Sequence, residues 1–234
     1  HMEYRSLWTG LLAVFAALTF AGCSQNDKMR PPAISFKPQN APVVPRSMNQ
    51  MSREVGIRVS YMPKSTYARK RASSMTPRFI TIHSTANPKG DANAHSRYLN
   101  SGKSRSLNWH FTVDQFGAYQ HIPTTETGHH ADHSGPGDKY SVAIEMCECT
   151  THNPAVIYNK TAKLTALLMQ RYGIPLRNVV PHNYWSGKNC PAPLMTNGRP
   201  GYKWSWFISR VDYYHRCICL LYTSPSPRDT ERSR

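Results

Sequence analysis

The chain has 234 residues, of which 39% are hydrophobic and 18% charged, and it carries 29 Lys and Arg against 13 Asp and Glu. This length suits one domain with appended segments, and the composition excludes collagen-like, wholly disordered and polytopic membrane proteins. The basic balance indicates an anionic partner, such as nucleic acid, a membrane surface or an acidic polymer, and says nothing about the fold. The six cysteines are too few and too unevenly spaced for a disulfide scaffold.

The positive charge is uneven along the chain. Residues 1–76 hold 11 Lys and Arg against 3 Asp and Glu, whereas residues 77–217 hold 15 against 8, so the middle of the chain is only mildly basic. The sequence has no RNP-like aromatic motif, zinc-finger spacing or helix-turn-helix signal. Nucleic acid is therefore not expected as a partner.

The N-terminal segment has the pattern of an export signal. Arg5 precedes an apolar run over residues 7–22 that is too short for a comfortable transmembrane helix. The run ends at Cys23 in a small-residue context that resembles a bacterial lipobox, in which the cysteine is lipidated. We expect residues 1–23 to be a signal peptide, with a plain cleaved signal or a retained anchor as alternatives. The protein is expected to be exported, either membrane-anchored through Cys23 or secreted.

Two polar segments flank the predicted domain. Residues 24–54 are polar and rich in proline, which predicts a disordered, flexible tether. Residues 218–234 are expected to be a non-native or disordered tail, since the chain from residue 223 onward is polar and rich in Pro, Ser and Arg. Residues 55–217 remain as one folded domain, expected to be a monomer. Deleting most of the tether and the end of the tail is expected to leave thermal stability nearly unchanged.

The middle of the chain is predicted to alternate between strands and helices. A strand is expected at 79–82, and Asp91 is expected to cap a helix that runs to about Asn100. The other expected elements are strands at 109–114, 119–122, 140–146 and 179–180, loops at 128–138 and 181–200, a helix ended by Gly173, and a last helix at 204–214. This order predicts an α/β domain, with a central mixed β-sheet flanked by helices.

The stretch from 182 to 191 is the sharpest local feature. His182 and Cys190 lie eight residues apart in a predicted loop and can reach one ion, and imidazole plus thiolate is a zinc-type ligand set. Catalytic zinc usually takes three protein ligands and leaves one position for water. His83 is a candidate third ligand, because it closes the strand at 79–82 and a strand end is rigid and open to a cleft.

Four stretches together resemble a known family. They are IHSTANP at 82–88, WHFTVD at 109–114, the pair Ile144-Glu145, and HNYWSGKNCP at 182–191, in this order and at these spacings. The set resembles the type-2 N-acetylmuramoyl-L-alanine amidases, which include phage endolysins and bacterial autolysins and share their fold with the peptidoglycan recognition proteins. The resemblance covers about Val55 to Tyr214. It implies an amidase-2-like fold, zinc as cofactor and peptidoglycan as the partner.

The resemblance also implies a role for each candidate site residue. Zinc would be held by His83, His182 and Cys190, with Glu145 as general base and Lys188 as stabiliser of developing negative charge. A carboxylate in an apolar strand is costly to bury unless it is paired or functional, and a cation beside an oxyanion stabilises a tetrahedral intermediate. The structural alternatives are a packed histidine, a buried cysteine, an ion-paired glutamate and a solvated lysine.

Three further residues are candidate substrate contacts. His130 matches a Trp-His-Ala stretch that lines the cleft in the family, and His129 replaces the tryptophan of that stretch. Trp109 and His110 either line the same cleft or pack in the core. Some relatives carry a tyrosine at the position of Trp109, which argues against a catalytic role there.

The sequence as a whole predicts an exported zinc amidase. It would hydrolyse the amide bond between N-acetylmuramic acid and L-alanine in peptidoglycan. One alternative is a non-catalytic muropeptide-binding module on the same fold, although such modules typically lack the cysteine ligand that this chain keeps. A second alternative is an amidase that recycles anhydro-muropeptides, against which the export signal argues.

Overall fold

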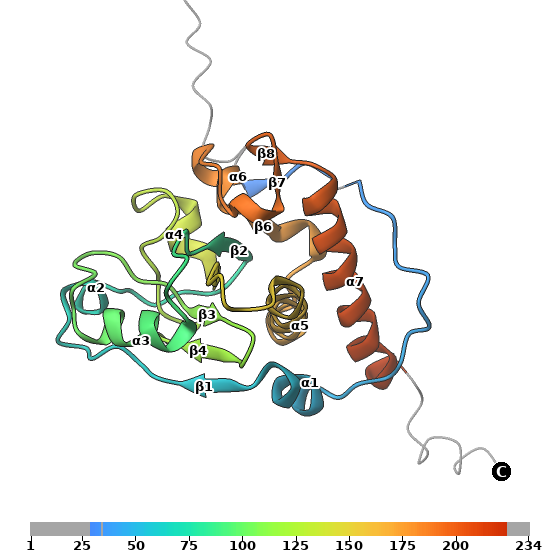
Figure 1. Cartoon of the computed structure of the whole chain (residues 1–234), viewed down its shortest axis with the longest axis horizontal. Helices are drawn as coiled ribbons and strands as arrows, with labels where there is room; N and C mark the ends of the chain where they lie inside the picture. The colour runs from blue at the N-terminus through green and yellow to red at the C-terminus, as the bar shows by residue number, and fades with distance from the viewer. Residues whose placement is uncertain (1–28, 34, 224–234) are drawn as a thin grey trace, which may run out of the picture.

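The computed structural model describes residues 29–33 and 35–223, so the expected signal peptide, Cys23 and the end of the tail lie outside the described residues. A six-stranded sheet in the order β1-β4-β3-β5-β2-β6 forms the centre of the molecule (Figure 1). Its strands are β1 (Ile57–Val59), β2 (Phe79–Ser84), β3 (Phe111–Val113), β4 (Ala118–Gln120), β5 (Ser141–Met146) and β6 (Val179–Pro181). Only the β3–β4 pair is antiparallel among these neighbours, so the sheet is mixed, as predicted.

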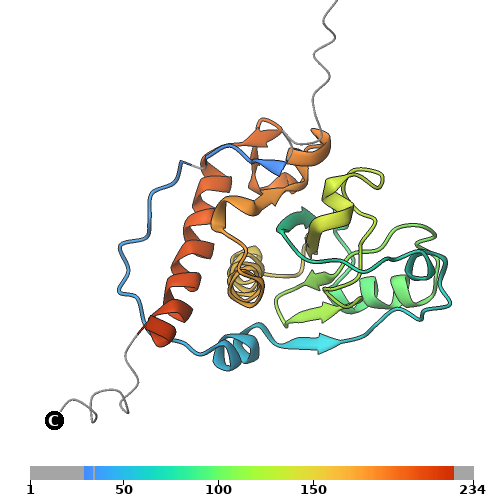
Figure 2. The same cartoon turned by 180° about the vertical axis from the view of Figure 1, so that it is seen from behind.

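The helices form layers on both faces of this sheet. They are α1 (Met48–Val55), α2 (Tyr67–Lys70), α3 (Ala92–Asn100), α4 (Pro136–Tyr140), α5 (Pro154–Tyr172), α6 (His182–Ser186) and α7 (Tyr202–Thr223). The long helix α5 lies against one face, with α1 and α7 packed on it, and α3 lies against β3 and β4 (Figures 1 and 2). A small hairpin of β7 (Met195–Thr196) and β8 (Arg199–Pro200) contacts α7. In the part of the chain that the structure describes, no helix combines the length and apolarity needed to cross a membrane.

The alternation of side chains along β2 and β5 places the candidate site. The main core, on the α5 side, receives every second residue of the two strands, namely Ile80, Ile82, Val142, Ile144 and Met146. Ala143 instead joins a second apolar cluster with Leu99 of α3. Because successive side chains of a strand point to opposite faces, His83 and Glu145 share the face opposite α5.

Two helix boundaries follow the predicted signals. The Asp91 side chain accepts a hydrogen bond from the backbone N–H of Ala94 and caps α3. Gly173 adopts φ 64° at the end of α5, a left-handed conformation that glycine adopts without strain, and its N–H donates to the carbonyl of Met169. Local capping chemistry marks both boundaries, and the side chain of Asp114 adds a tertiary contact at the start of α3 by accepting the backbone N–H of Ala92.

The N-terminal segment differs from the flexible tether predicted for residues 24–54. Residues 35–47, here called the strap, run along the outer side of α7 and lead into α1 (Figures 1 and 2). Phe36 and Val43 of the strap pack against the main core, and Met51 and Val55 of α1 are fully buried in it. A few apolar residues at long intervals anchor a segment whose average composition is polar.

The C-terminal helix also extends beyond its predicted end. The sequence predicted a helix over 204–214 and a domain boundary at 217, but α7 continues to Thr223. Tyr214, Cys217 and Ile218 are all buried. These three positions follow the i, i+3, i+4 spacing of one helix face, so the apolar stripe continues through the predicted boundary.

Candidate metal centre and active site

The candidate ligands meet where three parallel strands end. β2 lies between β5 and β6 and is parallel to both. His83 is the fifth residue of β2, and the register pairs it with Glu145 on β5. His182 begins α6 directly after β6, and Cys190 lies in the loop that follows α6. Ligands of α/β sheets commonly bind outside the carboxyl ends of the strands, and these residues lie at that edge.

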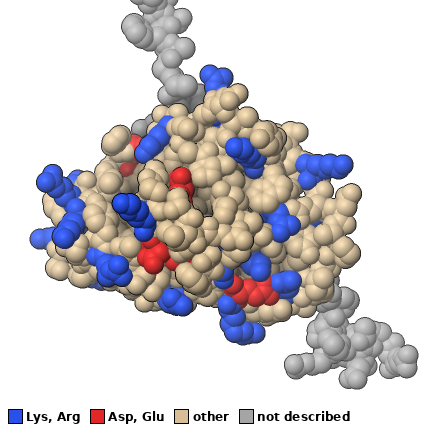
Figure 3. All heavy atoms as spheres, viewed as in Figure 1, with Lys and Arg blue, Asp and Glu red and all other residues tan. Residues whose placement is uncertain are grey.

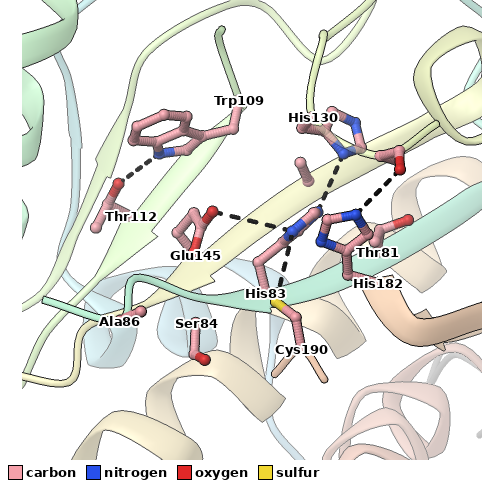
Figure 4. Close-up of polar contacts among 12 residues, drawn as sticks. Thr81, His83, Ser84, Ala86, Trp109, Thr112, His130, Glu145, His182 and Cys190 are labelled. Atoms are coloured by element: carbon pink, nitrogen blue, oxygen red, sulfur yellow. Dashed lines mark hydrogen bonds and ion pairs between the residues drawn. The ribbon is translucent and has the colours of Figure 1, made fainter. Parts of the chain in front are cut away.

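The structure brings the three sequence-predicted metal ligands together. One ligand atom from each of His83, His182 and Cys190 lies within 4.8 Å of the other two, and all three residues are buried. Nδ1 of His83 is 4.0 Å from Sγ of Cys190 and 3.9 Å from Oε1 of Glu145 (Figure 4). Two imidazoles and a thiol form a nitrogen and sulfur donor set, which is the set that zinc favours.

The ring of His182 is oriented as a metal ligand requires. Its Nε2–H donates to the carbonyl of Ala131 at 3.0 Å, so Nδ1 carries the lone pair. That Nδ1 is buried and has no hydrogen-bond partner among the described residues. Burial lowers the pKa of both His182 and His83, which keeps the rings neutral and able to ligate. An orphaned buried lone pair is costly, and a cation held by the three side chains would remove that cost.

The thiol of Cys190 must lose a proton before it can ligate. Burial raises its pKa to about 12 in the metal-free protein, and the nearby Glu145 carboxylate adds to the shift, while Lys188 opposes it. A binding cation therefore displaces the thiol proton, and metal affinity should increase as the pH rises.

Glu145 places a carboxyl group beside the ligands. Burial raises its pKa to about 8, against the opposing effect of the Lys188 ammonium. Oε2 of Glu145 is buried and lacks a hydrogen-bond partner within the described residues. A carboxyl group that titrates near neutral pH can take up and release protons under those conditions, which is what a general base must do.

The ligands and Glu145 line a pocket of about 390 Å³. Trp109, His130 and Lys188 line it as well. The indole Nε1–H of Trp109 donates to Oγ1 of Thr112 at 2.7 Å, which holds the ring at the pocket wall (Figure 4). Lys188 lies exposed in the loop between α6 and Cys190, so its ammonium can reach a group bound in the pocket.

His110 does not reach this pocket, and the prediction that it contacts substrate is wrong. It is fully buried. Its Nδ1 accepts the backbone N–H of Ala143 at 2.9 Å, so its Nε2–H donates to the carbonyl of Glu126, also at 2.9 Å. Burial lowers its pKa to about 3. The packing alternative holds, because both ring nitrogens are used to join neighbouring backbone segments.

A family comparison bears on this site. The family model Amidase_2, described as N-acetylmuramoyl-L-alanine amidase, matches residues 73–193. The matched range spans just over half of the chain and contains His83, Glu145, His182, Lys188 and Cys190. The chain belongs to this amidase family.

Curated amidases of Bacillus subtilis (strain 168) are similar to this chain. The N-acetylmuramoyl-L-alanine amidase XlyA is 46% identical over 125 residues, which are 52% of this chain and 42% of XlyA. The N-acetylmuramoyl-L-alanine amidase CwlH is 37% identical over 161 residues, which are 67% of this chain and 61% of CwlH. The chain thus matches about half the length of these relatives.

Solved structures of the amidase family have the same fold. The catalytic domain of XlyA superposes with a TM-score of 0.62 at 39% identity, covering 67% of this chain and 99% of that structure. PlyL superposes with a TM-score of 0.58 at 30% identity, covering 66% and 96%. The predicted amidase-2-like α/β fold is confirmed.

Two features of this amidase site were missed by the sequence reasoning. His130 lines the pocket as predicted, but its Nδ1 also lies 3.1 Å from Nε2 of His83. Ala131 supplies the carbonyl that orients His182. Neither contact has a local signal, because the loop of residues 128–135 meets β2 and α6 only in the folded chain. The predicted loop over residues 128–138 is a loop up to Gly135, where α4 begins with Pro136.

Acid is expected to destabilise the metal-free fold through its buried histidines. Burial lowers the pKa of His110 and His121 to about 3 and that of His130 to about 4, whereas an unfolded histidine titrates near 6.5. The unfolded state therefore binds more protons between about pH 4 and 6.5, and the free energy of unfolding falls as the pH falls through that window. Urea unfolding at neutral pH and at pH ~5 checks this.

Glu145 provides an internal control for this pH dependence. Its folded pKa is raised to about 8, so it releases a proton on unfolding in the same window and partly offsets the histidines. The variant Glu145→Gln should consequently lose stability more steeply in acid than the parent chain. Equal urea midpoints at both pH values in both proteins would show that these rings are not held neutral by the fold.

Proposed function

We propose that this protein is a zinc-dependent N-acetylmuramoyl-L-alanine amidase that hydrolyses the amide bond between N-acetylmuramic acid and L-alanine in peptidoglycan. The observation that carries the proposal is the convergence of His83, His182 and Cys190 beside Glu145 in an open pocket. Family membership and the names of the similar Bacillus amidases support the choice of substrate.

In this proposal the three ligands hold the zinc, and the other residues perform the proton transfers and charge stabilisation. The chemistry that zinc supplies when bound is Lewis acidity toward a carbonyl and a lowered pKa of water. Glu145 takes a proton from the attacking water and passes one to the leaving amine of L-alanine, as the carbon–oxygen bond forms and the carbon–nitrogen bond breaks. Lys188 stabilises the negative charge that develops on the carbonyl oxygen.

The substrate contacts follow from the lining of the pocket. Trp109 offers an indole face that its hydrogen bond to Thr112 keeps in place. His130 lies beside the ligands on the same wall. These two side chains are the candidates to contact the muramic acid or the first residues of the stem peptide.

We propose that the protein acts outside the cytoplasm, at the cell wall, and that a lipidated Cys23 anchors it to the membrane. The sequence pattern of residues 1–23 supports export. Lys and Arg side chains are spread over the face shown in Figure 3, with few acidic groups among them, and the whole chain carries a formal charge of +16. Such a surface is attracted to an anionic polymer or membrane.

Digestion of purified sacculi tests the activity. We expect new L-alanine amino termini and glycan strands with free lactyl carboxylates, both detected by mass spectrometry. The products should disappear with a zinc chelator and return when zinc is added. A binding module would sediment with sacculi without releasing either product, and a recycling enzyme would cleave only soluble anhydro-muropeptides. Either result would contradict the proposed function.

A further inference from the structure

One buried carboxylate lies behind both candidate histidine ligands. Asp138, the third residue of α4, is only 3% exposed. Its Oδ1 accepts the backbone N–H groups of His130 at 2.8 Å and Ala131 at 2.7 Å. Its Oδ2 accepts the backbone N–H of Ser134 at 2.7 Å and lies 3.0 Å from Nδ1 of His129. The Asp138 carboxylate thus contacts four residues of the loop that covers the metal ligands.

The two residues held by Oδ1 each contact a different ligand. The carbonyl of Ala131 accepts the Nε2–H of His182 at 3.0 Å. The ring of His130 lies with Nδ1 3.1 Å from Nε2 of His83 (Figure 4). His130 and Ala131 are consecutive, so Oδ1 of Asp138 holds the backbone of both residues. These two residues in turn contact the rings of His83 and His182.

The conformation of this loop requires such an anchor. His133 and Ser134 adopt φ values of 52° and 72°, which non-glycine residues rarely adopt. Backbone strain of this kind persists only where the surroundings determine it. Asp138 holds the N–H of Ser134, and the carboxylate of Asp132 accepts the N–H groups of Gly137 and Asp138 at 2.8 and 3.0 Å. The loop and α4 therefore hold each other in one conformation.

We propose that Asp138 is a positioning residue of the metal site. It fixes the backbone of His130 and Ala131 and, through them, the rings of His83 and His182. The inference rests on the metal site of the proposed function. The outer hydrogen-bond partners of metal-ligating histidines orient the rings, and loss of such a partner typically costs about 10- to 100-fold in metal affinity.

The test compares zinc affinity in two matched aspartate variants. Asp114 is 4% exposed and accepts the backbone N–H groups of Ala92, Phe116 and Gly117, at the end of β3 and away from the metal ligands. Asp114→Ala therefore removes the same kind of buried carboxylate and reports the general cost of doing so. Asp138→Ala should bind zinc about 10- to 100-fold more weakly than the parent chain, whereas Asp114→Ala should bind it as the parent does, although both lose stability. Competition with a chromophoric zinc chelator measures the affinities without using enzyme activity.

A conservative pair separates geometry from charge. Asp138→Asn keeps an oxygen that can accept from His130 and Ala131 but cannot also accept from Ser134, so it should lose less zinc affinity than Asp138→Ala. Asp138→Glu keeps the charge but adds a methylene in a closely packed position, which displaces the oxygens, so it should bind zinc at least ~10-fold more weakly than Asp138→Asn. This pair decides the question if Asp138→Ala does not fold.

The possible outcomes separate this inference from the proposed function. Two results would overturn the positioning role alone, provided that the parent chain binds zinc tightly. One is equal zinc affinity in Asp138→Ala and Asp114→Ala, and the other is equal zinc affinity in Asp138→Asn and Asp138→Glu. Failure of the parent chain to bind zinc would refute the metal site, and the positioning role would be refuted with it.

Discussion

The variant Glu145→Gln is expected to hydrolyse peptidoglycan at least ~100-fold more slowly than the parent chain, the scale for removing a general base, while still binding about one zinc ion. The substitution keeps the size of the side chain and removes only the group that accepts a proton. Glu145 lies 3.9 Å from Nδ1 of His83, adjacent to the three ligands without belonging to the set. Release of L-alanine amino termini from sacculi measures the rate, and zinc content is measured on the same samples.

Two companion variants give the expected contrast. Lys188→Ala should also keep zinc and lose at least ~100-fold in rate, the scale for removing one oxyanion donor. Cys190→Ser should lose zinc together with activity, because a hydroxyl is a poor zinc ligand beside a thiolate. Near-parental release by Glu145→Gln would exclude Glu145 as the base, and loss of zinc from that variant would place Glu145 among the ligands.

The parts of the fold and site that the sequence predicted correctly depend on short-range signals. The apolar strands β2 and β5 and the caps of α3 and α5 are encoded by adjacent residues. His182 and Cys190 lie only eight residues apart, at the start of α6 and in the loop after it, and His83 follows from the rule that strand ends face a cleft. The position of Glu145 opposite His83 comes from the register of β2 and β5, which the sequence did not predict.

The parts that were missed depend on contacts between distant segments. His110 neighbours a residue that lines the pocket, yet alternation along the chain turns its ring into the interior, toward the backbone of Ala143 and Glu126. Asp138 is unremarkable as a sequence position, and its importance arises only when the loop folds back over β2 and α6. The strap was misjudged because average composition hides a few well-spaced apolar anchors.

The strap makes a continuous series of contacts with the C-terminal helix. Five hydrogen bonds join them: Ser205 Oγ–H to the carbonyl of Ser35, Arg210 Nη1–H to Oε1 of Gln39, Arg216 Nη2–H to the carbonyl of Gln39, the Tyr213 hydroxyl to the carbonyl of Pro42, and the Arg46 N–H to the carbonyl of Cys217. Phe36 and Val43 add apolar contact with the main core. Arg46 also pairs with Glu54, which Lys163 of α5 contacts as well. The strap therefore fastens α7 onto α5, directly behind β2 and β5.

Starting the chain at Arg46 is therefore expected to destabilise the domain, whereas starting it at Met29 should not. The longer deletion removes two partly buried apolar side chains and four hydrogen bonds, which we expect to cost about 2 kcal/mol or more. For a domain of this size that loss corresponds to a melting temperature lower by roughly 5 °C or more. The deletion to Met29 leaves every one of these contacts in place and serves as the control. Zinc is expected to bind only the folded chain. Adding zinc should therefore restore part of the stability that the longer deletion loses. Equal melting temperatures for the two deletions would show that the strap is a tether after all, and that the domain begins at α1.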